Sequence, residues 1–196
     1  GKSRANKTGD LRDKKRWRVL FLSNGEKSLE EEIQGQGMNA GQLVRLIDIP
    51  VTKVKGCLKN SNQDESNTAL QNFHEFETNL HFSSHIHSKI TKQYGTAGAS
   101  FLDKYTSLSQ EDREKWSNRF SEIKQHIADE TLETHGNLAK DVLRALDRFS
   151  LVWLALDMAV SFNVLELDEN SIKQAVFSTL QAWIEHRGGV ASKESD

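Results

Sequence analysis

The chain has 196 residues, of which 36% are hydrophobic and 28% are charged, and its formal net charge is −2. This composition excludes a disordered chain, and no apolar run approaches the roughly 20 residues of a membrane-spanning helix. A single cysteine, Cys57, excludes an internal disulfide, and a single proline, Pro50, fits long helices. We therefore expect a soluble, cytoplasmic and helix-rich protein.

Basic side chains are concentrated at the start of the chain. Residues 1–18 contain eight Lys or Arg and two Asp, which gives +6 and leaves −8 for the other 178 residues. Because sequence-independent affinity for DNA comes from neutralised phosphates, we take Lys14, Lys15, Arg16 and Arg18 as candidate nucleic-acid-binding residues. The alternative is a solvated leader with no binding role.

Two apolar runs near the start predict strands. Residues 17–22 and 43–49 are rich in β-branched and aromatic or aliphatic residues, with a short helix predicted over 28–36 between them. The intervening segment, about 20 residues long, allows a parallel crossover. Because two strands do not form a stable sheet alone, either a second copy completes the sheet or the chain is the tail of a larger α/β domain. The start at Gly1, without a methionine, favours the fragment.

The rest of the chain predicts helices, after a polar linker at 59–68. Apolar spacing indicates helices from about 70 to 93, 109 to 135, 138 to 163, and 168 to 187. The part from Leu151 to Val160 is apolar nearly all round, as in a central bundle helix. The expected buried stripes of the last two helices consist of Leu138, Val142, Leu146, Phe149, Val152, Trp153, Leu156, Ala175, Val176, Leu180, Trp183 and Ile184.

Local signals also predict where these helices begin and end. Ser109, with Asp112 three residues later, resembles a capping box, and Asp168 is the expected N-cap of the final helix. Gly136 and Gly188 are the expected ends of the helices that precede them.

A histidine cluster and a partial phosphate-loop signature are weaker candidates. His81, His85 and His87 place two histidines on one helix face, but zinc needs further ligands and none has suitable spacing. Surface histidines are therefore expected, with no metal site. The segment 1–3, Gly-Lys-Ser, matches the end of the P-loop signature but precedes a polar, basic segment, so a Walker motif is not expected there.

The end of the first predicted strand is a more informative polar cluster. In parallel α/β sheets, ligands lie beyond the carboxyl ends of the strands. Ser23, Asn24 or Glu26 is therefore placed to approach a bound phosphate. The equally acceptable alternative is a polar turn that caps the following helix.

Seven segments in order along the chain carry a resemblance to one family, namely residues 1–5, 17–26, 40–50, 94–97, 101–102, 148–152 and 182–189. Together they resemble a P-loop family, the domain of unknown function numbered nine hundred and twenty-seven. This family occurs in primase–helicase-like proteins of phages, plasmids and integrated elements. The chain departs from its pattern at Asn24, where the family usually has threonine.

The resemblance implies a mainly α chain with a small α/β part. The last parallel strands of a RecA-like P-loop core would occupy about 17–50, and a C-terminal helical bundle about 68–187. The corresponding domains are 1–58, with the basic segment and the core remnant, and 69–196, the helical domain. The lysine that binds nucleotide and the acidic strand that binds metal lie upstream in the family. ATP and Mg²⁺ would thus belong to the parent protein, and this fragment alone would be inactive and bind neither.

The resemblance also implies roles for individual residues. Ser23, Asn24 and Glu26 would form a sensor-like cluster near the γ-phosphate or the attacking water. Arg45 would be a sensor or an inter-subunit arginine finger, unless it pairs with Asp48 or with a helix carboxylate. The implied function is the C-terminal part of an ATP-dependent DNA helicase or translocase of a mobile element. Its partners would be DNA, the missing half of the ATPase core and further copies of the chain, with no membrane. The alternative is a non-enzymatic helical module that docks protein or DNA.

Overall fold

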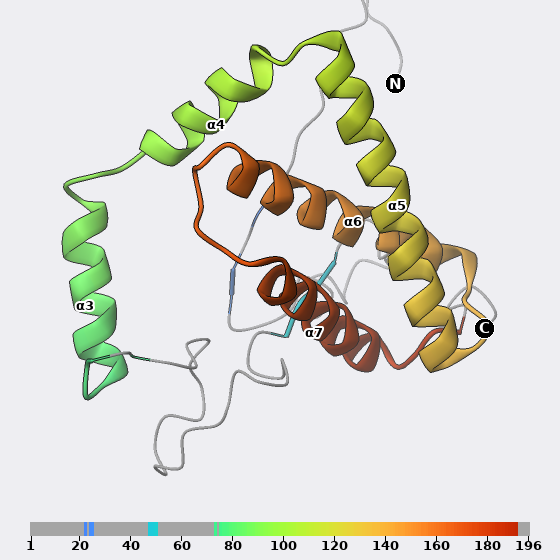
Figure 1. Ribbon diagram of the computed structural model, residues 1–196. Coiled ribbons are helices and arrows are strands. Elements are labelled where there is room, and N and C mark those ends of the chain that lie inside the picture. The colour runs from blue at the N-terminus through green and yellow to red at the C-terminus, as the bar shows by residue number, and fades with distance from the viewer. Residues whose placement is uncertain (1–21, 23, 26–46, 51–72, 74, 192–196) are drawn as a thin grey trace, which may run out of the picture.

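The computed structural model describes residues 22, 24, 25, 47–50, 73 and 75–191. This part of the chain is mainly helical, as the sequence predicts. Figure 1 shows its arrangement: α5, α6 and α7 lie against one another, whereas α3 and α4 form an arm that extends to one side. The helices are α3 (Asn79–Ile90), α4 (Thr96–Thr106), α5 (Gln110–His135), α6 (Lys140–Ser161) and α7 (Glu169–Arg187).

The hydrophobic core lies where α6 packs against α5 on one side and α7 on the other. Ile127 and Val142 are fully buried, and Leu180 is 2% exposed. Two buried hydroxyls are satisfied within their own helices, because Thr131 donates to Ile127 O and Ser150 donates to the carbonyl four residues before it. The core side chains are Ile123, Ile127, Leu138, Val142, Ala145, Leu146, Phe149, Trp153, Ile172, Val176, Leu180, Trp183 and Ile184.

The predicted ends of α5 and α7 are confirmed. The Ser109 hydroxyl accepts a hydrogen bond from the Asp112 N–H at 3.1 Å, and an Asp168 carboxylate oxygen accepts one from Ser171 N–H at 2.9 Å. Gly188 ends α7 with φ of 90°, in the left-handed region that suits glycine. Gly136 likewise follows the last residue of α5.

The first predicted helix is too long. Residues 75–78 are not helical, and α3 begins only at Asn79, where the Thr78 hydroxyl accepts a hydrogen bond from His81 N–H. Leu80 in the first turn of α3 is 72% exposed. The structure also contains a helix that the sequence analysis does not predict, α4, which Gly95 precedes with φ of 77°.

For two residues of the predicted buried stripes, the prediction of burial is wrong. Val152 is 54% exposed and Ala175 is exposed, whereas Ala182 is buried in α7. Leu151 is 57% exposed as well, so α6 is not buried all round. The reason is that, within the described part of the chain, α6 has helices packed along two of its sides only.

The predicted strands are not confirmed. Residues 22, 24, 25 and 47–50 have no strand structure, and Leu22 is 99% exposed. Ile47 is half-buried and packs against the core of the bundle. The other residues of the predicted strands lie outside the described residues, so the RecA-like part of the fold stays a prediction.

Candidate functional site

Most of the residues that the sequence singles out lie outside the part of the chain that the structure describes. Ser23, Glu26 and Arg45 lie outside the described residues, and Asn24 is exposed. The four candidate nucleic-acid-binding residues also lie outside the described part, namely Lys14, Lys15, Arg16 and Arg18. Their proposed roles therefore stay predictions.

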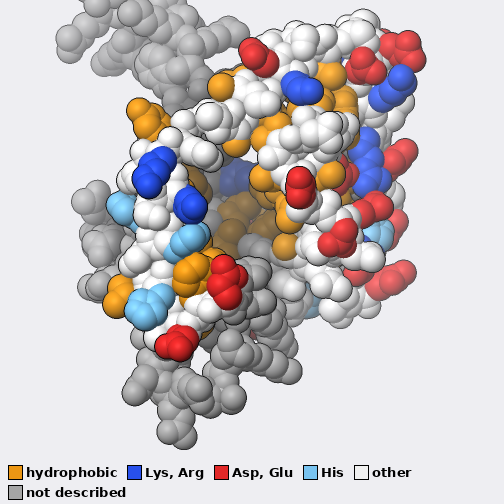
Figure 2. Space-filling view, turned by 60° about the vertical axis from the view of Figure 1, so that its left-hand side comes forward, with side chains coloured by type: hydrophobic (Ala, Val, Ile, Leu, Met, Phe, Trp, Pro, Cys, Tyr) orange, Lys and Arg blue, Asp and Glu red, His pale blue; other side chains and the backbone are white. Residues whose placement is uncertain are grey.

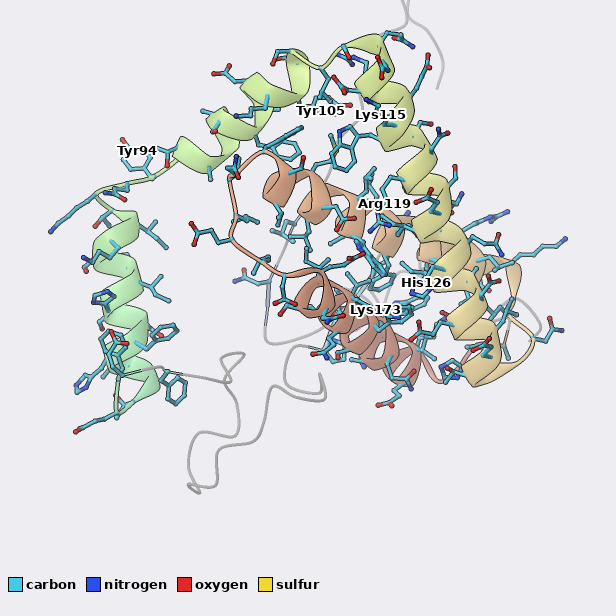
Figure 3. The ribbon with its side chains drawn as sticks, in the orientation of Figure 1. Tyr94, Tyr105, Lys115, Arg119, His126 and Lys173 are labelled. Atoms are coloured by element: carbon cyan, nitrogen blue, oxygen red, sulfur yellow. The ribbon has the colours of Figure 1, made fainter. Side chains whose placement is uncertain are left out.

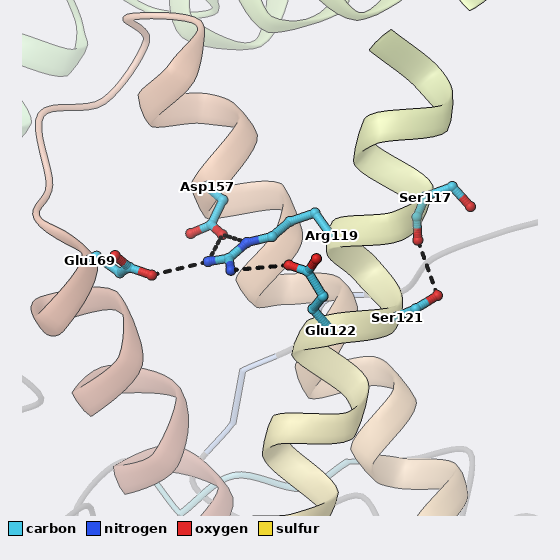
Figure 4. A network of polar contacts seen from close by, with 6 residues as sticks. All are labelled: Ser117, Arg119, Ser121, Glu122, Asp157 and Glu169. Atoms are coloured by element: carbon cyan, nitrogen blue, oxygen red, sulfur yellow. Dashed lines mark hydrogen bonds and ion pairs between the residues drawn. The ribbon is translucent and has the colours of Figure 1, made fainter. Parts of the chain in front are cut away.

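A polar group that joins three helices is centred on Arg119 of α5 (Figure 4). Its guanidinium donates to Asp157 of α6 through Nε at 2.9 Å and pairs with the same carboxylate through Nη2 at 2.8 Å. Nη2 also reaches Glu169, the first residue of α7, at 3.2 Å, and Nη1 lies 3.7 Å from Glu122. One side chain of α5 thus ties together all three helices of the bundle.

Electrostatics keep this arginine charged. Burial alone would lower the pKa of Arg119, but hydrogen bonds and charge from Asp157, and then from Glu169, raise it above its usual value. The Asp157 side chain is only 12% exposed, so the pair is partly removed from solvent. The arginine is a structural cation here, since within the described part of the chain its guanidinium contacts carboxylates of its own chain.

A second ion-pair group lies about three helical turns further along α5. Glu130 of α5 contacts His126 Nε2 at 3.3 Å and Lys173 Nζ of α7 at 3.1 Å. The ring of His126 also stands edge-on to Trp153 and Phe177, with centroids 5.7 and 5.9 Å away. Figure 3 shows His126 and Lys173 extending from α5 and α7 into the space between those helices.

These two groups border a half-open cleft of about 280 Å³. Trp153 forms part of its wall, and within the described part of the chain the indole Nε1 is buried without a hydrogen-bond partner. The cleft is near the lower end of ligand-site volumes, and its charged groups are already paired with one another. Its lining consists of Arg119, Glu122, Ile123, His126, Trp153, Glu169, Asn170 and Lys173. This arrangement stabilises the bundle and places no nucleophile beside a base.

The segments 148–152 and 182–189, which carry the resemblance, meet in space. The rings of Phe149 in α6 and Trp183 in α7 lie 5.9 Å apart, and the Arg187 guanidinium lies over the Trp183 ring at 5.7 Å. Arg187 is also paired with Asp141 in the first turn of α6, with side chains only 10% and 8% exposed. We call these four residues the Arg187 cluster.

The chain after α7 completes the Arg187 cluster. Arg187 Nη1 donates to the carbonyls of Gly189 and Ala191, at 2.7 and 2.9 Å. The backbone N–H of Ala139, just before α6, donates to Val190 O at 3.1 Å. Gly189, with φ of 110°, allows the chain to turn back toward α6. These residues therefore fasten the end of α7 to the start of α6, which is a structural role.

The predicted histidine cluster lies on the exposed arm. His81, His85 and His87 are all exposed on α3, and the ring of His85 packs on Phe76 with centroids 4.9 Å apart. Among the residues that the structure describes, no three His, Cys, Asp or Glu side chains are grouped as a metal ion would require. Nor is any described helix long and apolar enough to cross a membrane.

Comparisons of the chain with protein-family models, with curated proteins and with solved structures give no significant match. The resemblance to the P-loop family therefore stays a prediction carried by the segments named above.

Proposed function

We propose that the chain is the C-terminal part of an ATP-dependent DNA helicase or translocase of a mobile genetic element. In this proposal the helical part is an accessory domain, and an upstream RecA-like half binds ATP and Mg²⁺. The observation that carries it is the Arg187 cluster: segments 34 residues apart, which resemble the same family, meet at one buried contact.

The proposal assigns DNA contact to the basic start of the chain. The described range 75–191 contains 17 Asp or Glu and 12 Lys or Arg, which makes this part acidic and repulsive toward phosphates. Residues 1–18, at +6, have the opposite charge. Lys14, Lys15, Arg16 and Arg18 are therefore the first candidates for the DNA backbone.

Salt-dependent binding tests this assignment. Fluorescence anisotropy with labelled duplex DNA should give a salt slope of about −4 if the four side chains each neutralise one phosphate. Replacing all four by Gln should remove most of that slope. The matched control replaces four exposed lysines of the described part by Gln and should leave the slope unchanged; these are Lys89, Lys92, Lys104 and Lys140. Equal loss in both variants would contradict the assignment.

ATP turnover tests the other half of the proposal. The purified chain alone should not hydrolyse ATP. If it does, and Lys2→Ala abolishes the turnover, the assignment of ATP binding to an upstream half is wrong. When the chain is joined to an upstream ATPase half, Arg45→Ala and Asn24→Ala should lower turnover without weakening nucleotide binding equally. Unchanged turnover in both variants would remove their proposed sensor roles.

A non-enzymatic interaction module is the second candidate. It is favoured by the exposed arm, where α4 has no buried residue and Leu80, Tyr94 and Leu102 are each at least 60% exposed. Large apolar side chains in solvent are typical of surfaces that bind other proteins. Retention of a protein partner by a variant that no longer binds DNA would support this function over the first.

A further inference from the structure

Asn24 is the one asparagine of the chain that glycine follows, whereas the other 11 precede residues with a Cβ. Asn24 and Gly25 are both exposed and lie outside helices and strands. The backbone nitrogen after an asparagine can attack the side-chain carbonyl carbon when the chain bends to bring the two together. Glycine leaves this nitrogen unshielded and its backbone free to bend, because it has no Cβ. The pair therefore has the neighbour and the exposure that this reaction requires.

Hydrogen bonds hold the corresponding nitrogen in place at three other asparagines of the described part. The N–H after Asn163 donates to Ala159 O at 2.8 Å, and the N–H after Asn170 donates to an Asp168 carboxylate oxygen at 2.9 Å. Asn118 lies within α5, where the backbone is fixed in helical geometry. A nitrogen held in this way reaches the side chain only after local opening of the structure. These three asparagines are therefore protected.

Asn137 has surroundings that resemble those of Asn24 in one respect. It is exposed and lies outside any helix, between α5 and α6. Leu138 follows it, however, and this side chain is 7% exposed and belongs to the hydrophobic core. A buried leucine fixes the backbone and shields its nitrogen, so we expect Asn137 to stay unmodified. Asn137 thus serves as an internal control in the same molecule.

We infer that Asn24 is a site of spontaneous covalent modification through a succinimide ring. The Gly25 nitrogen bonds to Cγ of Asn24, and the bond from Cγ to the side-chain nitrogen breaks. That nitrogen leaves as ammonia, with the proton that the Gly25 nitrogen gives up. Water then opens the ring: attack at Cγ gives aspartate, and attack at the main-chain carbonyl gives isoaspartate. Water is the only co-reactant, and the inference does not depend on the proposed ATPase function.

The modification changes both the charge and the main chain at this position. A carboxylate replaces a neutral amide, so the formal net charge of the chain moves from −2 to −3. Residues 75–191 are already acidic, and Figure 2 shows many Asp and Glu side chains over the bundle. The modified chain should therefore be retained more strongly on an anion exchanger. In isoaspartate the main chain also runs through the side-chain carbons, which lengthens it by one atom.

Incubation of the full chain at mildly alkaline pH, followed by peptide mapping with mass spectrometry, measures the reaction. The peptide with residue 24 should gain the mass difference between oxygen and NH and should separate into aspartate and isoaspartate forms. The reaction should be slower at mildly acidic pH, because less of the Gly25 nitrogen is deprotonated. Gly25→Ala should slow it several-fold by adding a Cβ, and Asn24→Gln should nearly abolish it, because the longer side chain closes a less favourable ring. Far-UV circular dichroism before and after incubation confirms that the chain stays folded.

Three results would overturn the inference. The first is an unchanged peptide at Asn24 after alkaline incubation, and the second is equal modification at Asn137. The third is a rate in Gly25→Ala equal to that of the unsubstituted chain. A product with aspartate but no isoaspartate indicates direct hydrolysis and excludes the ring as well. These readouts are chemical, so failure of this inference and failure of the proposed motor function are separable.

Discussion

Replacing Arg187 by methionine should be one of the most damaging single changes to the described domain. Methionine replaces only the apolar stem of the arginine and leaves the carboxylate of Asp141, whose side chain is 8% exposed, without its cation. It also removes the two hydrogen bonds to Gly189 and Ala191 and the contact with the Trp183 ring. Removing one partner of a buried ion pair typically costs about 3–5 kcal/mol, and we expect a loss of unfolding free energy in that range.

Urea unfolding followed by far-UV circular dichroism gives the free energy of unfolding for each variant. The matched control is Lys124→Met, because Lys124 and Asp147 also join α5 to α6, at 2.7 Å, but are 42% and 52% exposed. Its cost should be at most about 1 kcal/mol, as for exposed pairs. A double variant with Asp141→Leu and Arg187→Met should recover at least half of the loss, because no buried charge remains unpaired. If Arg187→Met costs less than about 1 kcal/mol, the pair is effectively solvated and the reasoning fails.

Three further changes test other parts of the structure. Gly188→Ala should lower the free energy of unfolding by roughly 1–2 kcal/mol, because φ at this position is 90°, and no atom lies within 4 Å of the added Cβ. The control is Gly98→Ala, inside α4 and equally free of neighbours, which should not lower the free energy of unfolding. Trp153→Phe should cost less than about 2 kcal/mol, since it removes a buried N–H that has no partner among the described residues; a larger loss would indicate an unseen partner. The side-chain hydrogen bond from Ser171, followed by that from its backbone N–H, lowers the pKa of Asp168 in the folded state. The stability that the Asp168 carboxylate contributes is fully present above its unfolded-state pKa and is lost as pH falls through its folded-state pKa. Asp168→Asn should therefore lose less thermal stability than the wild type between about pH 5 and pH 2.5.

The ends of the helices could be predicted because their signals are local. Ser109 and Asp168 each cap a helix through an N–H three residues later, and both lie where the sequence places them. Gly188 ends α7 for the same kind of reason, since a left-handed residue is required within one turn of the last helical carbonyl. By contrast, Thr78 was not identified as a cap, because the apolar pattern before it suggested that the helix had already begun.

The polar contacts between helices could not be predicted from spacing along the chain. Arg119 lies 38 residues from Asp157 and 50 from Glu169, and Arg187 lies 46 residues from Asp141. Nothing local distinguishes Arg119 from the other charged side chains of α5. Which apolar residues of α6 stay in solvent depends likewise on how many elements pack around it, so the exposure of Val152 could not be derived from its helical position.

Three parts of the chain differ in net charge and respond differently to salt. Residues 1–18 carry +6, residues 75–106 are neutral, and residues 107–191 carry −5. Binding of DNA through the first part must weaken as salt rises, because counterions compete for the phosphates. A contact through the neutral part must be almost indifferent to salt, whereas repulsion from the acidic part weakens as salt screens it. The salt dependence of a binding activity therefore indicates which of these three parts carries it.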